Sequence, residues 1–357
     1  MKSKEFSLLF SLLRAALWQT PPDAALFVDI NEDSWKKIMN LAAHHSVFAL
    51  TFDGAMLLPT QAMPPRPLQL TWVAQIDRIE QQYAYKLSVL KEMETLFSQN
   101  GIKMLHFKGF ALAQCFPVPE HRQFGDLDIY LFWQTKQGHR LLLENGATPN
   151  YRSYKHLCVI YKKVMIENHA YFLNTHDSRK IKASDKMLKK IISDSEESLS
   201  WTEFPVDFQA LFYMFHTIHH FSWEAFSVKL LIDLAAFWKT NLTKIDIERY
   251  RQALKSVNLI KQADAITSLT VNFLQIDKNC VPPFEIDRIL EDKMLYYMFF
   301  PYVPTKIDDG FIPILKLKWE RFFHRAKSYE LVYPGENYKR FISSLISNLK
   351  NRTFLKS

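Results

Sequence analysis

Two aspartates, Asp126 and Asp128, stand one residue apart at the start of an apolar run that continues to Phe132. On a β-strand, residues i and i+2 lie on the same face, so both carboxylates would project to one side of the strand. Paired like charges near a core are costly unless a cation neutralises them. Mg²⁺ prefers oxygen ligands from one or two carboxylates, completed by waters and substrate phosphates. The pattern therefore predicts a strand that carries a metal site suited to phosphoryl or nucleotidyl transfer.

The residues upstream of the aspartates indicate a phosphate-binding turn. An apolar run over 102–107 predicts a strand that ends at Lys108-Gly109, and a helix is expected over 110–115. A glycine at a strand-to-helix turn allows close backbone approach, and a helix N-terminus offers N–H groups to phosphate. Lys108 would add a positive charge there, or it is a solvated lysine at a strand end. Arg122 is either a phosphate clamp or a salt-bridge partner of the acids.

These motifs resemble the nucleotidyltransferases of the polymerase-β-like superfamily, and most closely its uncharacterised bacterial branch. That branch has the signature Lys-Gly, Tyr/Phe-Pro, Arg and Gly-Asp-x-Asp, and the segment that resembles it spans roughly residues 25–245. The superfamily takes a third carboxylate from a later strand, and Glu167 within the run Val164–His169 resembles it. The matching residues are Lys108, Gly109, Leu112, Ala113, Phe116, Pro117, Arg122, Gly125, Asp126 and Asp128.

The resemblance implies a metal-dependent enzyme that uses a nucleoside triphosphate such as ATP. Asp126, Asp128 and Glu167 would be the catalytic residues and would hold Mg²⁺ or Mn²⁺, with Glu167 as a possible general base. The nucleotide would be bound by Lys108, Gly109, Arg122 and His169. Alternatively, His169 orients Glu167 or is an ordinary hydrogen-bonded strand histidine. The acceptor would be a protein side chain, a sugar or another small molecule. Nucleic acid is possible but is not favoured, because no basic module interleaved with aromatics stands out.

One departure from the superfamily pattern supports a different function. The superfamily has Gly-Ser or Gly-Gly at the turn, whereas bulky Phe110 follows Gly109 in this chain. A phenyl ring that blocked the phosphates would leave a catalytically degenerate nucleotide-binding or partner-binding protein of the same fold. A kinase, which releases a nucleoside diphosphate, is the alternative enzyme.

Composition and charge restrict the fold class and the compartment. With 48% hydrophobic and 23% charged residues, the chain of 357 residues is an ordinary globular protein, and only eight glycines favour helices. The net charge of +8 suits an anionic partner but does not require one. No apolar run is long enough to predict a membrane span. Cys115, Cys158 and Cys280 match neither zinc spacing nor a disulfide framework, so a cytoplasmic location is expected.

The expected fold is α+β and predominantly helical, with a small mixed β-sheet core flanked by helical regions. The predicted regions are an N-terminal helical region (1–98), a nucleotidyltransferase-like α/β core (99–180) and a C-terminal helical domain (181–357). Prolines over 59–67 must interrupt the first region, and 176–198 is predicted to be an exposed connection or flap. Helices are predicted over 6–18, 32–45 after the cap Asn31, 68–99, 135–145, 208–221 and 227–240, and a hairpin over 154–161 and 164–173.

A histidine cluster on the predicted helix over 208–221 has two interpretations. His216 and His220 stand one helical turn apart, and with Asp233 they would share a metal ion. The alternative follows from the resemblance, because the related branch also has a His-rich helix followed by a helix with Asp. In that case His216, His219, His220 and Asp233 contact substrate or lock the helical domain to the core.

Overall fold

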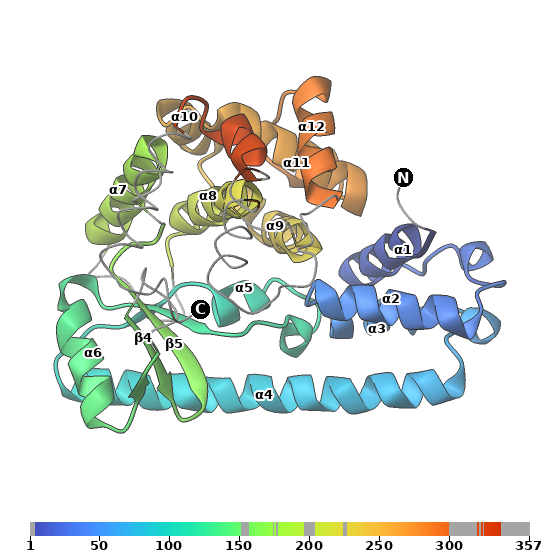
Figure 1. Ribbon diagram of the computed structural model, residues 1–357, viewed down its shortest axis with the longest axis horizontal. Helices are drawn as coiled ribbons and strands as arrows, with labels where there is room; N and C mark the ends of the chain where they lie inside the picture. The colour runs from blue at the N-terminus through green and yellow to red at the C-terminus, as the bar shows by residue number, and fades with distance from the viewer. Residues whose placement is uncertain are drawn as a thin grey trace.

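A computed structural model describes residues 4–150, 157–173, 175, 178–195, 204–223, 227–299, 320, 323 and 325–336. In these ranges the chain is mostly helical with one small mixed sheet, which confirms the predicted fold class (Figure 1). The helices are α1 (Lys4–Trp18), α2 (Glu32–His44), α3 (Phe48–Ala55), α4 (Arg66–Gln99), α5 (Gly109–Ala113), α6 (Thr135–Glu144), α7 (Arg179–Asp194), α8 (Val206–Trp223), α9 (Val228–Asn241), α10 (Ile247–Ser256), α11 (Ile260–Leu274) and α12 (Arg288–Phe299).

Local sequence signals explain where several helices begin and end. Asn31 accepts a hydrogen bond from the Ser34 amide and caps α2, as predicted. The proline-rich stretch over 59–67 separates α3 from the long helix α4, also as predicted. Helix α3 itself was not predicted. It packs so closely on α1 that a Cβ atom at Gly54 would lie 2.0 Å from the Leu12 carbonyl oxygen.

The sheet has the strand order β1-β2-β5-β4-β3. Strand β1 pairs with β2 in antiparallel fashion, β2 and β5 are parallel, and the remaining pairs are antiparallel. The predicted hairpin is present, with a turn at Lys162 and Lys163 whose φ angles are 48° and 62°, but its second strand ends at His169 and not at Leu173. Residues 154–156 of that prediction lie outside the described residues. The strands are β1 (Leu105–His106), β2 (Leu127–Tyr130), β3 (Thr148–Pro149), β4 (Leu157–Tyr161) and β5 (Val164–His169).

Alternation along β2 assigns its side chains to two different layers. Leu127 and Ile129 belong to the apolar cluster that the sheet shares with the C-terminal half of α4. Tyr130 belongs to the other large cluster, which includes α8 and α9. Figure 1 shows α4 running beneath the sheet, with α8 and α9 on the opposite side. Because residues i and i+2 share a face, Asp128 lies on the same side as Tyr130 and projects toward the helical layer.

The prediction of an exposed connection over 176–198 is wrong for the part that the structure describes. Ser178 caps α7 by accepting a hydrogen bond from the Lys180 amide, and the helix continues to Asp194. Its buried apolar residues, Ile181, Leu188 and Ile192, recur at helical spacing. The many lysines between them form the exposed face and concealed this amphipathic pattern. Residues 176–177 and 196–198 lie outside the described residues.

Two further predictions concern the membrane and the cysteines. Across the described ranges, we find no helix with the length and apolar character needed to cross a membrane. The three cysteines are free thiols, as their spacing predicted. The predicted domain boundaries at 98 and 180 stay a prediction.

A buried histidine ties the loop before β2 to two helices. The short 3₁₀ helix Pro119–His121 ends at His121, whose Nδ1 lies 2.7 Å from Asp53 on α3. Its Nε2 lies 2.9 Å from Glu80 on α4. Burial alone would lower the pKa of His121, but the two carboxylates outweigh it and raise the pKa above its usual value. The imidazolium therefore donates to both helices and positions the loop that continues into Arg122.

We expect this histidine clamp to weaken as the pH rises. The pKa of His121 is higher in the folded protein than its value of about 6.5 in the unfolded chain. The stability that the clamp contributes is therefore complete below about pH 6.5 and is lost as the pH rises through the folded-state pKa. His121→Gln should reduce the free energy of unfolding by about 1 to 3 kcal/mol at low pH. Urea unfolding of both proteins between about pH 5.5 and about pH 9 measures this difference, and subtraction cancels the other titrating groups.

His44→Gln, at an exposed histidine, is the matched control and should not lower the free energy of unfolding by the amount expected of His121→Gln. A deficit of His121→Gln that stayed constant or grew with rising pH would contradict the clamp.

Candidate functional site

The register of two parallel strands brings two of the predicted acids together. Asp128 on β2 is directly opposite Glu167 on β5, and His169 follows two residues later on the same face of β5. One ligand atom from each of these three side chains lies within 4.8 Å of the others. His169 Nε2 is 3.0 Å from Asp128 Oδ1 and 3.5 Å from Glu167 Oε2. This group of two carboxylates and an imidazole is compact enough to hold one metal ion.

Asp126 lies immediately before β2 and lines a cavity together with Asp128, but it is not part of the group formed by Asp128, Glu167 and His169. Burial and the negative charges of Asp128 and Glu167 raise the pKa of the Asp126 carboxyl, with Lys108 acting in the opposite direction. The negative charge on Asp126 is therefore unfavourable unless a further cation binds close to it. This fits an ion held by carboxylate oxygens, the ligands that Mg²⁺ and Mn²⁺ prefer.

Cationic side chains neutralise Asp128. Lys108 Nζ lies 3.4 Å from Asp128 Oδ2, and His169 is on the other carboxylate oxygen. Burial alone would raise the pKa of Asp128, but the Lys108 and His169 charges hold it well below its usual range. Burial likewise works against the charge on His169, yet its bonds to Asp128 and Glu167 raise its pKa to about 9. The imidazolium donates to both carboxylates and fixes their orientation.

The Lys-Gly turn is tight and uses one of its own helix N–H groups. Gly109 has a φ of +28°, and a Cβ atom there would lie 3.0 Å from His106 Nε2. The Phe110 amide donates to that nitrogen at 3.2 Å, while His106 Nδ1 donates to the Asp128 carbonyl oxygen at 3.0 Å. Burial lowers the pKa of His106 to about 4, so the ring is neutral and can accept. His106 was not among the predicted site residues, although a histidine in an apolar strand before the turn was a visible signal.

The Phe110 ring points away from the phosphate-binding turn. Its side chain is buried and packs edge-to-face on Tyr83 and Phe124, in the cluster shared by α4 and the sheet. Phe110 is not among the residues that line the cavity at Lys108 and Gly109. The ring therefore does not block this cavity.

A cavity of about 280 Å³ lies between these residues and the helical layer. The sheet side contributes Asp126, Asp128 and the Lys108-Gly109 turn. The rest of the lining comes mainly from α8, α9 and the loop before β2. These residues are Ser46, Leu112, Arg122, Gln123, Phe124, Gly125, Tyr213, His216, Thr217, His220, Ser227, Lys229, Leu230, Asp233 and Leu234.

Arg122 binds an acid, but not one of the three predicted catalytic acids. Its Nε and one terminal nitrogen donate to the two oxygens of Asp233 at 2.8 and 2.9 Å, and its other terminal nitrogen donates to the Gly109 carbonyl at 3.0 Å. Lys229 donates to the same Asp233 carboxylate at 3.0 Å. Arg122 therefore joins the Lys-Gly turn of the core to helix α9. Charge-assisted bidentate geometry of this kind is strong and directional.

The histidine cluster gives no zinc site with Asp233. His216 and His220 line the cavity with ring centroids 4.2 Å apart. Asp233 Oδ1 accepts a hydrogen bond from Arg122, and Oδ2 accepts from both Arg122 and Lys229. Within the described residues, the close group of potential metal ligands is Asp128, Glu167 and His169. Asp233 instead locks the helical layer to the core. Burial lowers the pKa of His216 well below its usual value, so that ring is neutral.

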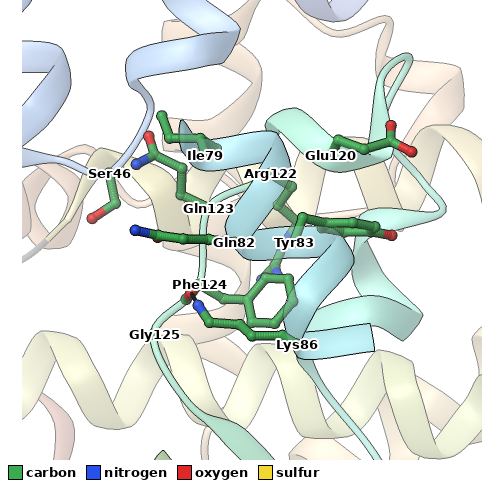
Figure 2. A pocket seen from close by; sticks show the side chains of 10 residues that line it. All are labelled: Ser46, Ile79, Gln82, Tyr83, Lys86, Glu120, Arg122, Gln123, Phe124 and Gly125. Carbon is green, nitrogen blue, oxygen red and sulfur yellow. Dashed lines mark hydrogen bonds between the residues drawn. The ribbon is translucent and has the colours of Figure 1, made fainter. Parts of the chain in front are cut away.

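A second cavity of about 210 Å³ lies on the other side of the loop before β2, against α4 (Figure 2). Ser46, Gln82 and Gln123 carry polar groups at one end, and the Gln123 side-chain oxygen accepts from the Phe48 amide at 2.9 Å. Lys86 runs alongside the Phe124 ring and donates to the Phe124 carbonyl. The two cavities share Ser46, Arg122, Gln123, Phe124 and Gly125, so they adjoin at this loop.

Comparisons with known proteins add a family but no characterised relative. No curated protein matches the chain, and no solved structure matches it. A family model described as "uncharacterised nucleotidyltransferase" matches residues 31–275, which include every residue of the site described above. This confirms the resemblance inferred from the motifs. The chain belongs to this family of uncharacterised nucleotidyltransferases.

Proposed function

We propose that this protein is a metal-dependent nucleotidyltransferase that moves a nucleoside monophosphate from a nucleoside triphosphate to a hydroxyl group. Asp126, Asp128 and Glu167 would hold Mg²⁺ or Mn²⁺. The observation that carries the proposal is the register of Asp128 opposite Glu167, together with the position of Asp128 beside Asp126 and Lys108 in the lining of the larger cavity. Family membership supports the same chemistry.

The divalent ions, when bound, would lower the pKa of the acceptor hydroxyl and stabilise the charge on the leaving pyrophosphate. The chain's own residues would orient the reactants. His169 Nε2 holds Asp128 in place through a hydrogen bond and Glu167 through an ion pair. Lys108, which neutralises Asp128 in this structure, is close enough to turn toward a phosphate once a metal ion replaces it. Glu167, with a side chain 23% exposed, is the carboxylate that could accept the proton of the acceptor.

Two cavities that meet at one loop suit a reaction with two substrates. The triphosphate would occupy the larger cavity beside the acids, and the acceptor would approach from the smaller one. A volume of about 210 Å³ fits a small molecule or a single side chain rather than a nucleic-acid duplex. The hydroxyl and amide groups of Ser46, Gln82 and Gln123 suit an acceptor rich in hydroxyl groups.

The alternative, a catalytically degenerate binding protein, depends on whether the Lys108-Gly109 turn can bind phosphate. The Phe110 ring is packed in the core, so it does not support this alternative. The Phe110 amide does support it, because its N–H is bonded to His106 and is not available to phosphate.

Asp126→Asn and Asp128→Asn should each abolish turnover, but the two substitutions should change the stability of the protein differently. Asp126→Asn removes a charge that burial and neighbouring acids disfavour, so the metal-free protein should be as stable as the wild type or more stable. Asp128→Asn removes the partner of Lys108 and His169, and should lower the free energy of unfolding by about 1 to 3 kcal/mol. Urea unfolding in EDTA and a transfer assay measure the two effects. Transfer at the wild-type rate by Asp128→Asn would refute the catalytic role.

The products should identify the reaction class. Purified protein incubated with each α-labelled nucleoside triphosphate, Mg²⁺ and a cell extract should give a labelled acceptor and release pyrophosphate. Chelation with EDTA should stop the reaction, and excess Mg²⁺ or Mn²⁺ should restore it. Release of a nucleoside diphosphate with transfer of the γ-phosphate would show a kinase. Binding of nucleotide without either product would favour the degenerate alternative.

A further inference from the structure

The helical side of the larger cavity carries more positive than negative charge. Arg122 and Lys229 share a single carboxylate, Asp233, and all three side chains line the cavity. Two cations and one anion leave one positive charge in a region where the Lys229 side chain is 18% exposed and the Asp233 side chain 9%. Buried charge is costly unless a counter-charge is close, so this wall is suited to an incoming anion.

The sheet side of the same cavity has the opposite imbalance. Asp126 and Asp128 line the cavity with Lys108, and Glu167 and His169 lie next to Asp128. Three acids and two cations leave one negative charge on this side. The cavity is therefore polarised, with an acidic wall on the sheet and a basic wall on α9. A polyphosphate that carries a divalent cation has the complementary distribution, with the cation toward the acids and the phosphate oxygens toward the opposite wall.

We propose that Lys229 is the principal cation of a phosphate subsite on α9, which binds the terminal phosphates of the nucleoside triphosphate. The assignment of these phosphates to the leaving pyrophosphate rests on the proposed nucleotidyl transfer. The existence of an anion subsite at Lys229 does not depend on it. The sequence motifs predicted phosphate binding at Lys108, Gly109 and Arg122, and Lys229 was not among the predicted residues.

Arg122 and Lys229 differ in how many donors they have left. Arg122 uses Nε and both terminal nitrogens on Asp233 and Gly109, and the residue is only 3% exposed. Lys229 has three N–H donors on its ammonium group, and one hydrogen bond, to Asp233, is described for it. Two donors can therefore turn into the cavity without loss of the Arg122–Asp233 pair.

Electrostatics and the position of Lys229 agree with this assignment. Burial, and then the charge of Arg122, lower the pKa of Lys229 to about 8, even though Asp233 raises it. A bound phosphate would supply the missing negative charge. Lys229 lies in the first turn of α9, just after the cap Ser227, where the positive end of the helix also favours an anion.

The Lys108-Gly109 turn, which was predicted to bind the phosphates, has fewer available donors than the α9 side of the cavity. Helix α5 has only five residues, and the Phe110 amide at its start is bonded to His106. Lys108 is paired with Asp128, with Nζ 3.4 Å from Oδ2. The α9 wall can therefore bind an anion before any metal is present, whereas the turn cannot offer a free cation until a metal ion displaces Lys108.

The test is calorimetric titration of inorganic pyrophosphate into the full-length protein in EDTA. The wild type should bind pyrophosphate, and Lys229→Met should bind at least about tenfold more weakly, as expected for loss of a charge-assisted hydrogen bond. Lys229→Arg should retain most of the affinity. The control Lys239→Met removes an exposed lysine from the same helix and should bind like the wild type.

Asp128→Asn distinguishes this proposal from the proposed function. It should retain metal-free pyrophosphate binding even though it has no transfer activity. Another outcome is that the wild type shows no transfer activity while Lys229→Met still binds pyrophosphate more weakly than the wild type. That result would support the anion subsite and refute nucleotidyl transfer.

No pyrophosphate binding by the wild type, or equal binding by Lys229→Met, would overturn the subsite. Loss of binding in a Lys108 variant but not in Lys229→Met would also overturn it. Circular dichroism and thermal unfolding confirm that each variant is folded, and Lys229→Gln replaces Lys229→Met if the latter is not.

Discussion

The parallel pairing of β2 and β5 is the constraint on which the site depends. It places Asp128 opposite Glu167, and the two-residue period of the strands turns both toward the helical layer while Leu127 and Ile129 enter the core beneath. A shift of one residue in this register would bury the carboxylates against α4 and expose the apolar side chains. Packing of Leu127 and Ile129 against α4 thus determines the direction in which Asp128 points, and so positions the candidate site on the opposite face.

The second requirement is that the helical layer stays in position over that face. A bidentate bond from Arg122 to Asp233 and a bond from Arg122 to Gly109 connect α9 to the Lys-Gly turn. His121, one residue before Arg122, is held by carboxylates on α3 and α4. The short loop before β2 is therefore fixed from both sides. This gives the cavity a defined shape and a separation of charge between its walls.

The sequence allowed the fold class and most long helices to be predicted because those features are local, and the Asp126/Asp128 pair was visible for the same reason. The spacing of Asp126 and Asp128, the cap at Asn31 and the apolar periods are each visible within a few residues. Helix α7 was missed because its charged residues outnumber its apolar residues, so that composition suggested a solvated segment although the helical spacing was present. The role of Arg122 was left open because its partner, Asp233, is 111 residues away in the chain. Lys229 was missed for the same reason, because its charge matters only once α9 faces the sheet across the cavity.

The central claim is that Asp128 and Glu167 converge with Asp126 to bind a divalent cation. Its most direct test is electron paramagnetic resonance of Mn²⁺ titrated into the protein, which counts bound ions without requiring the acceptor. The account predicts that the wild type binds Mn²⁺ and that Asp128→Asn and Glu167→Gln each lose most of that affinity while remaining folded. Undiminished Mn²⁺ binding by both variants, or no binding by the wild type even with nucleoside triphosphate present, would contradict it.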